Sequence, residues 1–570
     1  MKRSGAQIVW EGLVRAGVDV VWGIPGGQNL PIFDALAKYE YPIHFVLTRH
    51  EQGASHMADG YARASGRVGV CMATSGPGAT NLVTGLATAY MDSSPIIAIT
   101  GQVASTILGR DGFQEADIAG ITTPITKHNY LVTNVNELPA VMMEAFYIAS
   151  TGRPGPVLID ICRDVQNAQT DAPWPDSVNL PGYRPNLVAA PEKAVDDVAR
   201  LINDAQRPLI VVGQGVTISG AHAHVRKLAE RADIPVASSL LGLSAFPRSH
   251  PLALGMGGMH GEAFTNMALQ TCDVLLAIGA RLDDRLTGAF ATFAPQAKIA
   301  HIDIDPAELG KNLTIHYPLV GDARLTLELL IPRVQPAQHP EWRAQISAWR
   351  SDTDSHDILA QKSTTLVPPY VISQLEEQAR GSIVVSDVGQ HQMWEAQYFP
   401  HNEPRSHITS GGLGTMGFAL PAAIGASFAR PEAEIWVVVG DGGFQMTMCE
   451  LAVLIQEKKP VKIAIINNGY LGMVRQWQDI LYEKRYSGSP LISPDFCTIA
   501  EAYGIPALRV TERSAVADAI RTARQTDGPF LLDFRVEQLA MVYPMVLPGK
   551  SNAEMLRRPL PEMANGQEGK

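Results

Sequence analysis

The sequence has 570 residues, of which 46% are hydrophobic and 18% charged, and its formal net charge is −11. This length predicts several domains, because a single hydrophobic core stops growing beyond about 250–300 residues. The acidic balance argues against a nucleic acid as partner, and no apolar run is long enough to cross a membrane. Five scattered cysteines without a CxxC pair predict buried thiols rather than disulfides, and the amphipathic N-terminus lacks the pattern of a signal peptide. We therefore expect a cytoplasmic enzyme.

The first third of the chain, residues 1–170, alternates short apolar runs with amphipathic segments. The predicted strands lie at 20–24, 43–48, 68–74, 95–100 and 156–161, and the predicted helices at 4–16, 29–39, 49–65 and 79–90. Such an alternation is typical of a parallel sheet that is covered by helices on both faces. A proline-rich stretch, 171–191, then predicts a linker.

Two further units of the same kind follow. Residues 190–335 have predicted strands at 208–213, 234–239, 274–279 and 298–305, and residues 360–548 have them at 382–387, 434–439, 461–466 and 529–534. A second proline-rich linker is predicted at 331–342. The expected fold is therefore α/β, with three doubly wound parallel-sheet domains that share a pattern but no detectable sequence repeat.

The stretch from Gly440 to Asn468 carries the most specific chemical signal. It is predicted to form a strand, a helix at 446–458 and a second strand, which makes the two strands parallel. Asp441 and Asn468 then follow the carboxyl ends of neighbouring strands, where open α/β sheets bind ligands. A carboxylate and an amide oxygen suit Mg²⁺, which takes its other ligands from phosphates and water. The alternative is an ordinary strand-end turn before a capped helix.

The same stretch resembles the signature of thiamine-diphosphate enzymes, in which GDG is followed about two dozen residues later by NN. Here 24 residues, 443–466, separate the two motifs.

Glu51 permits two interpretations. With Thr48 it matches a helix capping box. It also lies in RHEQGASHMADGYAR (49–63), and the resemblance implies a glutamate here that contacts the cofactor's aminopyrimidine from a pocket that excludes water.

From about residue 4 to 548 the chain resembles the catalytic subunit of the acetohydroxyacid (acetolactate) synthase family. The motifs are GIPGG (23–27), TSGPGATN (74–81), GRDGFQEAD (109–117), GARLDDRLTG (279–288), SGGLGTMGFALPAAIGA (410–426) and GYLGMVRQWQ (469–478). The resemblance implies decarboxylation of pyruvate with thiamine diphosphate and ligation of the two-carbon unit to pyruvate or 2-ketobutyrate, the first common step of branched-chain amino-acid biosynthesis. Another thiamine-diphosphate and FAD enzyme, such as pyruvate oxidase, is the alternative.

The resemblance also implies roles for individual residues. The Mg²⁺ ligands would be Asp441, Asn468 and the carbonyl of Tyr470. Thiamine diphosphate would contact Glu51, Gln390, His391, Gly414, Met416, Gly440, Gly442, Gly443, Gly472 and Met473. Gly27, Phe113 and Gln114 would line the substrate side, and Arg285 and Trp477 would contact the acceptor ketoacid.

A second cofactor, FAD, is implied for the central domain. Its binding positions would be Arg153, Gly213, Gly215, Met259, His260, Gly261, Gly279, Arg281, Asp303 and Asp322. Residues 412–417 also spell GxGxxG, but 406–411 is a poor strand, so we predict no dinucleotide site there. The family geometry places Glu51 of one subunit and Asp441 of another on one cofactor, which implies a homodimer or a dimer of dimers. The sequence leaves open whether a small regulatory subunit binds.

Overall fold

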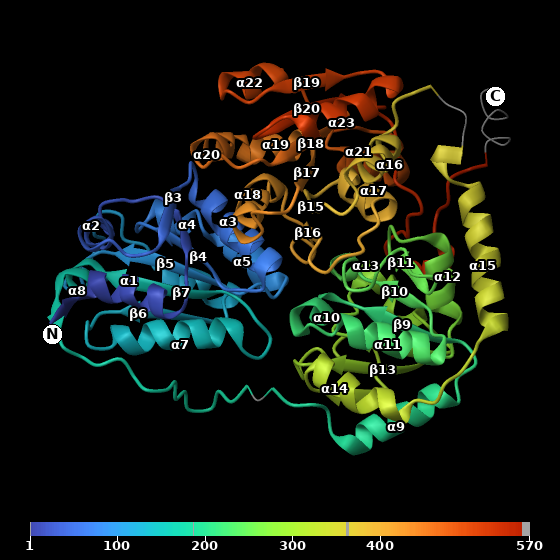
Figure 1. The fold of residues 1–570 in the computed structure, drawn as a ribbon, viewed down its shortest axis with the longest axis horizontal. Coiled ribbons are helices and arrows are strands. Elements are labelled where there is room, and N and C mark those ends of the chain that lie inside the picture. Colours follow the sequence, from blue (N-terminus) through green and yellow to red (C-terminus); the bar gives the residue numbers. More distant parts are fainter. Residues whose placement is uncertain (1, 186, 361–363, 561–570) are drawn as a thin grey trace.

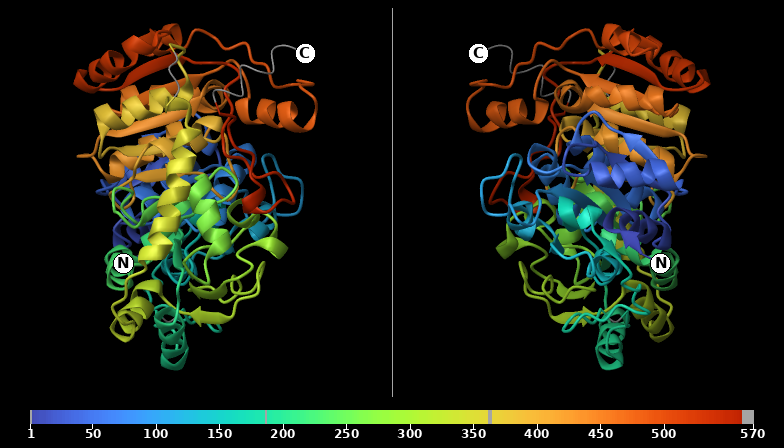
Figure 2. Two further views of the ribbon diagram at one scale, coloured as in Figure 1. Left: turned by 90° about the vertical axis from the view of Figure 1, so that its right-hand side faces the viewer. Right: turned by 90° about the vertical axis from the view of Figure 1, so that its left-hand side faces the viewer.

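A computed structural model describes residues 2–185, 187–360 and 364–560, which fold into three α/β domains (Figure 1). Each domain is built on a six-stranded sheet in which all neighbouring strands are parallel. In both figures the C-terminal domain, orange to red, lies above the other two (Figures 1 and 2). The predicted fold class is confirmed, while the predicted domain limits stay predictions. Within the described ranges every helix is too short or too polar to reach across a bilayer.

The N-terminal sheet has the strand order β3-β2-β4-β5-β7-β6. Its strands are β2 (Val20–Gly23), β3 (His44–Leu47), β4 (Gly69–Ala73), β5 (Ile96–Gln102), β6 (His128–Val132) and β7 (Val157–Cys162). The helices named below are α1 (Gly5–Arg15), α2 (Leu30–Tyr39), α3 (Glu51–Ser65), α4 (Pro77–Thr80) and α5 (Val83–Met91). Only β6 was not predicted. It is a half-exposed edge strand that begins with two polar residues, so it lacks the continuous apolar run of a central strand.

The central sheet has the order β11-β10-β9-β12-β13-β14. Its strands are β9 (Pro208–Val212), β10 (Val236–Ser238), β11 (Ala253–Met256), β12 (Val274–Ile278), β13 (Lys298–Asp303) and β14 (Tyr317–Val320). Helices include α10 (Gln214–Ser219), α12 (Ala263–Thr271) and α14 (Ala323–Leu330). The two strands absent from the prediction, β11 and β14, are the two edges of the sheet. Each is four residues long, which leaves little periodicity to detect.

The C-terminal sheet has the order β16-β15-β17-β18-β20-β19. Its strands are β15 (Ile383–Ser386), β16 (His407–Thr409), β17 (Ile435–Gly440), β18 (Lys462–Asn467), β19 (Ala507–Val510) and β20 (Phe530–Arg535). The helices used below are α17 (Gln390–Tyr398), α18 (Ala419–Ala429), α19 (Asp441–Thr447), α20 (Leu451–Gln456) and α21 (Gly472–Leu481). The edge strands β16 and β19 were missed, and β16 lies where we expected a poor strand.

The first and third domains share one topology. When strands are counted in chain order within each domain, both sheets read second, first, third, fourth, sixth, fifth. The central sheet differs and reads third, second, first, fourth, fifth, sixth, the order of a dinucleotide-binding fold. The two outer domains are therefore related in backbone architecture although their sequences show no repeat.

Three predicted segments need correction. The helix expected at 79–90 is two helices, α4 and α5, separated by two residues. The helix expected at 446–458 is two helices, α19 and α20, joined by a tight 3₁₀ turn at Met448–Glu450. This turn directs the Glu450 carboxylate toward the N-terminal domain. The linker expected at 331–342 contains a 3₁₀ turn, and helix α15 (Pro340–Ser355) begins inside it. Proline is favoured at a helix start, and the indole of Trp342 is buried in the central domain, where it donates to the Pro208 carbonyl (3.1 Å).

The N-terminal and C-terminal domains share a continuous core in which α3 packs on α18. Glycines allow the two helices to approach closely. A Cβ built on Gly60 would lie 2.0 Å from the Ala422 carbonyl oxygen, and one built on Gly425 would lie 1.9 Å from the Met57 carbonyl oxygen. Any side chain at either position would force the backbones apart. This contact fixes the helix that begins with Glu51 against the domain that carries Asp441.

Candidate active site

Asp441 and Asn468 follow neighbouring parallel strands, as predicted. Gly440 at the end of β17 pairs with Ile466 of β18. Asp441 and Asn468 therefore both lie where the strands of the C-terminal sheet end, a region that we name the C-terminal edge. Asp441 is fully buried, and its Oδ2 accepts a hydrogen bond from the hydroxyl of Ser493 (2.7 Å). Burial raises the pKa of Asp441, although the Ser493 hydroxyl opposes the shift. Its other oxygen, Oδ1, is buried without a hydrogen-bond partner.

An orphaned carboxylate oxygen needs an explanation, because buried polar atoms in folded proteins almost always have partners. A cation supplies one. Oδ1 of Asn468 accepts from the amide of Tyr470 (3.1 Å), so the turn after β18, the strand next to β17, holds a second hard oxygen at this edge. Carboxylate and amide oxygens are suited to Mg²⁺. The residues present therefore fit the predicted metal.

Gln390 and His391 reach the same edge from the first turn of α17. Oε1 of Gln390 accepts from the Asn468 amide group (3.3 Å), and Nε2 of His391 accepts from the Gly440 amide (3.3 Å). The glycines are required by this packing. A Cβ built on Gly472 would lie 2.2 Å from Oε1 of Gln390, and one on Gly440 would lie 2.9 Å from the His391 ring. Burial lowers the pKa of His391 to about 3, so it is a neutral imidazole at pH 7.

The loop that contains Met416 is held above this edge by Asp387, a residue that the sequence analysis missed. Its buried carboxylate accepts hydrogen bonds from the amides of Gly417 (2.9 and 3.1 Å) and Ala419 (3.2 Å). Burial raises its pKa to about 6, although the backbone amides oppose the shift. Met416 then lies beside Gly442, where a built Cβ would be 3.6 Å from its Cε atom. An acid as the last residue of a predicted strand, 382–387, was the available signal.

Three further predicted residues lie around the same edge. Gly414 has a φ of 72° in the loop before Met416, a conformation that favours glycine. Gly443 lies in α19, where a built Cβ would be 3.0 Å from Oδ1 of Asp387. Met473 is half-buried on α21 and packs against the core of the C-terminal domain. The loop 412–417 lies between β16 and α18, so the expectation of a poor strand before it was wrong, and the absence of a dinucleotide site there stays a prediction.

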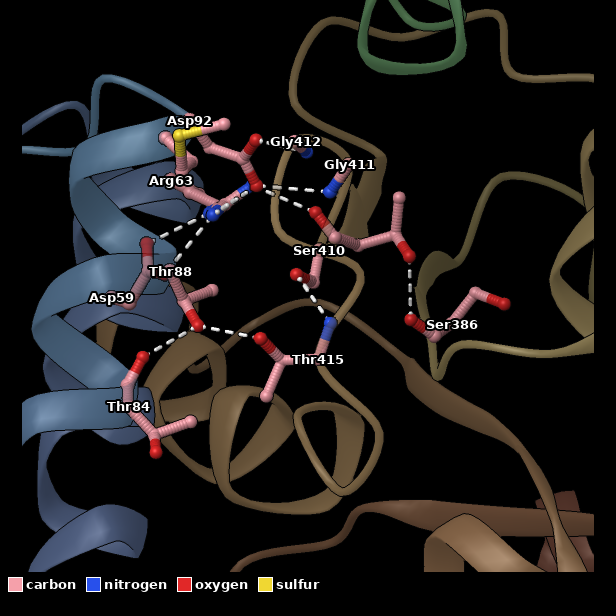
Figure 3. A network of polar contacts seen from close by, with 12 residues as sticks. Asp59, Arg63, Thr84, Thr88, Asp92, Ser386, Ser410, Gly411, Gly412 and Thr415 are labelled. Atoms are coloured by element: carbon pink, nitrogen blue, oxygen red, sulfur yellow. Dashed lines mark hydrogen bonds and ion pairs between the residues drawn. The ribbon is translucent and has the colours of Figure 1, made fainter. Parts of the chain in front are cut away.

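The N-terminal domain also holds this loop, through a buried network around Arg63 (Figure 3). The guanidinium donates to Asp59 (2.7 Å), to Asp92 (2.9 Å) and to the carbonyl of Thr409 (2.7 Å). Asp92 in turn accepts from the amides of residues 411 and 412 (2.9 and 2.6 Å). Arg63 and both acids are buried, so the guanidinium offsets part of the two carboxylate charges and the backbone amides stabilise the rest. The sequence analysis overlooked these residues, although an Arg–Asp pair four apart in an apolar helix is a recognisable signal.

Glu51 is the first residue of α3 and does not form the predicted capping box. The helix begins two residues later than that box requires, and its N-cap residue is His50. The His50 ring accepts from the Gln52 amide (3.1 Å), and the Thr48 amide, which Glu51 would bind in the predicted box, donates to the Gly23 carbonyl (3.2 Å). The Glu450 carboxylate of the other domain accepts hydrogen bonds from the amides of Arg49 (3.2 Å) and His50 (3.0 Å) just before the helix. Glu51 is thus released from capping. Its Oε2 accepts from the side-chain amide of Asn81 (2.9 Å) in a 9% exposed position.

The other residues predicted for the N-terminal domain lie with Glu51 where the strands of the N-terminal sheet end, a region that we name the N-terminal edge. Gly27 is in the turn after β2, and the space beside its Cα is open. Gln114 has a φ of 62° and its backbone lies 2.9 Å from a Cβ built on Gly76, in the turn after β4. Phe113 is 84% exposed, which is unusual for an aromatic side chain. The N-terminal edge therefore gathers Glu51, Gly27 and Gln114, and leaves Phe113 facing outward.

Comparison with known proteins agrees with this geometry. Family models of the thiamine pyrophosphate enzymes match residues 3–121 (N-terminal TPP binding domain), 195–330 (central domain) and 387–534 (C-terminal TPP binding domain). The acetolactate synthase large subunit of Corynebacterium glutamicum is 48% identical, over 97% of this chain and 90% of its own length. Acetolactate synthases of Mycobacterium bovis (50%; 97% and 91%) and Arthrospira platensis (47%; 97% and 97%) are similar over the same extent. The chain belongs to the thiamine-pyrophosphate-dependent acetolactate synthases.

The residues that the acetolactate synthase resemblance assigned to FAD surround the switch point of the central sheet, between β9 and β12. Gly213, Gly215 and Gly279 are packed against one another: a Cβ on Gly213 would lie 2.1 Å from the Gly279 carbonyl oxygen, and one on Gly215 2.6 Å from the Gly279 Cα. These glycines therefore allow two turns to touch. Asp303 ends β13, and burial raises its pKa to about 6. Asp322 is already engaged as the N-cap of α14, where it accepts from the Leu325 amide (2.9 Å).

The remaining predicted FAD residues form contacts between domains. Arg153 of the N-terminal domain pairs with Glu308 (2.6 Å) and Asp305 (3.2 Å) of the central domain. Arg281 donates to the Met91 carbonyl (3.1 Å) and to Asp283 (2.9 Å). The turn of Met259, His260 and Gly261 follows β11 and contacts the C-terminal segment, where His260 lies 3.2 Å from the Pro544 carbonyl oxygen.

Arg285 and Trp477, the predicted specificity residues of the acetolactate synthase family, approach from two domains. The Arg285 side chain is 61% exposed, and its guanidinium contacts the Met259 sulfur (3.3 Å). Trp477 is half-buried on α21. The segment after Ala540 connects them: Val542 exchanges hydrogen bonds with Gln476, and the Val546 amide donates to the Met259 carbonyl (2.9 Å). Nothing among the described contacts joins Arg285 directly to Trp477.

Proposed function

We propose that this chain decarboxylates pyruvate with thiamine diphosphate and Mg²⁺ and ligates the two-carbon unit to a second 2-ketoacid, in branched-chain amino-acid biosynthesis. The observation that carries the proposal is the unpartnered, buried Oδ1 of Asp441 at a glycine-lined sheet edge. An ordinary strand-end turn would leave this oxygen either exposed to water or hydrogen-bonded. A metal-bound diphosphate accounts for both the orphaned oxygen and the close packing around it.

In this proposal Asp441, Asn468 and the carbonyl of Tyr470 hold Mg²⁺, while Gln390 and His391 face the diphosphate. When bound, thiamine diphosphate supplies an electron sink for the loss of carbon dioxide. The neutral His391 fits a hydrogen-bonding rather than a charge-pairing role, because its ring nitrogen already accepts from the Gly440 amide. Asp387 keeps Met416 beside the diphosphate edge through the loop that it anchors.

Glu51 is proposed as the residue that exchanges a proton with the cofactor's aminopyrimidine. Three observations support this role. Its carboxylate is buried, it does not cap α3 because the His50 side chain does so, and one oxygen accepts from Asn81. Asn81 orients the carboxylate without neutralising it, since an amide donates a hydrogen bond but no charge. The second oxygen, Oε1, remains available for a ligand.

The two half-sites are proposed to meet between two copies of the chain. Within one chain, no hydrogen bond or ion pair of the described residues joins Glu51 to Asp441. Large apolar side chains are exposed beside both halves: Phe113 near the first, and Leu413, Met446 and Ile492 near the second. Exposed apolar groups of this kind mark interaction surfaces. A homodimer would cover them and complete two equivalent sites.

FAD is proposed for the central domain, at the crevice where the strand order reverses. Such crevices bind dinucleotides in open α/β sheets. Gly213 and Gly215 would offer backbone to the pyrophosphate, and Asp303 a carboxylate to a ribose. Among the predicted FAD residues, Asp322 is the least available to a ligand, because its carboxylate already caps a helix. Visible flavin absorbance that stays with the purified protein after gel filtration would support this assignment, and a colourless holoprotein that takes up no added FAD would contradict it.

Arg285 and Trp477 are proposed to select the acceptor ketoacid. The exposed guanidinium of Arg285 offers a bidentate partner to a carboxylate, and Trp477 offers an apolar surface to one extra methyl group. Since one methylene in such a contact is worth about 1–3 kcal/mol, Trp477→Leu should reduce the preference for 2-ketobutyrate over pyruvate by about tenfold or more. Val474→Ala, on the exposed face of the same helix, is the matched control.

The activity itself is tested by a competition assay with pyruvate and 2-ketobutyrate, in which both acetohydroxyacid products are quantified. The proposal expects both products and no consumption of oxygen. The alternative, a pyruvate oxidase, would consume oxygen or another electron acceptor in proportion to pyruvate. Sustained oxygen uptake in an oxygen electrode without acetohydroxyacid formation would overturn the proposal.

A further inference from the structure

Glu395, His401 and His407 form a buried cluster outside the site described above. Their candidate ligand atoms all lie within 4.8 Å of one another. Glu395 belongs to α17, His407 opens β16, and His401 lies in the loop between them. The side chain of Glu395 is fully buried, and those of the two histidines are 1% exposed. The cluster therefore joins the helix that starts with Gln390 to the strand that leads into the loop of Met416.

Much of the hydrogen-bonding capacity of this cluster is unused. Nε2 of His401 lies 2.6 Å from Oε1 of Glu395, which is a charge-assisted hydrogen bond. By contrast, Oε2 of Glu395 and both ring nitrogens of His407 have no hydrogen-bond partner. Nδ1 of His407 is 3.3 Å from that Oε2, but not in hydrogen-bond geometry. In a tetrahedral site with metal–ligand bonds of about 2.0–2.1 Å, two ligand atoms are roughly 3.4 Å apart.

We propose that Glu395, His401 and His407 bind one Zn²⁺ ion. Two imidazoles and one carboxylate are a ligand set that Zn²⁺ takes when one position is left for water. The ion would replace the proton shared by His401 and Glu395, which is released to solvent. That pair would then open by roughly 0.8 Å to the tetrahedral separation. A cavity of about 190 Å³, lined by Phe399 and Ser406 among others, reaches the cluster at His401.

The bound Zn²⁺ would have a structural role. Glu395 lies little more than one helical turn beyond Gln390 and His391, the residues that face the diphosphate edge. His407 precedes Ser410, whose hydroxyl accepts from the Thr415 amide in the loop of Met416 (3.0 Å). One ion at the cluster would tie these two supports of the cofactor edge together, in a place where the chain otherwise leaves buried polar atoms unpaired. The ion takes no part in the reaction.

The test uses the full chain, saturated with thiamine diphosphate and Mg²⁺ so that the Asp441 site is filled, then exposed to excess Zn²⁺ and dialysed. Elemental analysis should find roughly one Zn²⁺ per chain, and Co²⁺ loading should give the visible absorption of a tetrahedral site. His407→Gln should lose the bound Zn²⁺. His250→Gln is the matched control, because it removes a histidine that pairs with Glu230 within the central domain. This variant should keep the bound Zn²⁺.

The proposal fails if the dialysed wild-type holoenzyme retains less than about a tenth of an equivalent of Zn²⁺, or if His407→Gln retains as much as the wild type. Either result would leave the cluster as a buried ion-pair network only. If His407→Gln does not fold, the wild-type protein tests the proposal by itself. Zn²⁺ should then raise the thermal midpoint of unfolding of the wild type in the presence of saturating Mg²⁺. An unchanged midpoint would overturn the proposed site. None of these readouts depends on acetolactate formation, so the proposed activity stands or falls separately.

Discussion

The N-terminal and C-terminal domains have the same strand order, yet the edges of their sheets carry different chemistry. In both, the first strand lies between the second and the third, so the order reverses at the same place. Open α/β sheets bind ligands at such a reversal. The N-terminal edge presents Glu51, which is oriented by Asn81. The C-terminal edge presents Asp441, whose Oδ1 has no partner.

This difference shows how one backbone architecture supplies two incomplete sites. The N-terminal edge holds a carboxylate with a neutral donor, which suits exchange of a proton. The C-terminal edge holds hard oxygens and close-packed glycines, which suit a metal and phosphates. Neither edge has what the other offers. The domains also support each other structurally, because Glu450 of one domain accepts hydrogen bonds from the amides of Arg49 and His50, directly before Glu51 of the other.

The largest expected effect comes from removing the acid of the N-terminal edge. Glu51→Gln keeps the shape and the hydrogen bond from Asn81 but cannot exchange a proton. Since general acid–base groups contribute about 10²–10⁴-fold, kcat should fall by that factor while thiamine diphosphate still binds. Steady-state kinetics and cofactor titration by tryptophan fluorescence measure the two effects. Full activity in this variant would remove Glu51 from the mechanism.

The C-terminal edge should respond differently, through binding rather than proton exchange. Asp441→Asn removes the charge next to the proposed metal, and activity should fall by about 10²–10³-fold, as expected for loss of one preorganised electrostatic group. Added Mg²⁺ should restore part of the activity that this variant loses. Ser493→Ala, which leaves the carboxylate intact and removes only the partner of Oδ2, should cost far less. Equal losses in both variants, without any response to Mg²⁺, would argue against a metal at Asp441.

The contact between the two domains is tested at Asp92. Asp92→Asn removes one of two charges that compensate the buried Arg63 and places an amide donor against the amides of residues 411 and 412. The free energy of unfolding should fall by about 1.5–3 kcal/mol, the range for hydrogen bonds to charged groups. Urea unfolding followed by tryptophan fluorescence measures the change. Asp352→Asn, in an exposed pair with Arg557, should change it by less than about 0.5 kcal/mol.

The smallest expected effect is a change in pH dependence at Glu450. Burial raises its pKa to about 7, although the Arg49 and His50 amides oppose the shift. Between the ordinary glutamate pKa and 7 the folded state holds a proton that the unfolded state has lost, so this contribution to stability falls as pH rises through about 7. Glu450→Gln keeps an oxygen for the two amides and cannot titrate. Its thermal midpoint should therefore depend less on pH between 5 and 8 than that of the wild type, whereas the exposed Glu537→Gln should follow the wild type.

The sequence predicted most central strands and the placement of Asp441 and Asn468 after two neighbouring ones, because buried parallel strands form continuous apolar runs and GDG and NN end two of them. It failed at edge strands such as β6, β11, β14 and β19, which are short or half-exposed. It also failed wherever a partner came from a distant segment. The Thr48 capping box was wrong because the helix begins after His50, whose side chain caps it, while Glu450, about four hundred residues away, holds the His50 amide. Asp387 was missed because its partner amides are thirty or more residues away, and Arg63 because its partners Asp92 and Thr409 are likewise distant in sequence.

The central claim is that the two edges meet between subunits, and one mixing experiment tests it most directly. Glu51→Gln and Asp441→Asn chains, each nearly inactive alone, are unfolded or dissociated together and allowed to reassociate in equal amounts. If each site takes one edge from each chain, half of the dimers are mixed and each mixed dimer has one intact site, so about a quarter of wild-type activity should return. If both edges belonged to one chain, every site would keep a substitution, and the mixture would remain as inactive as its components.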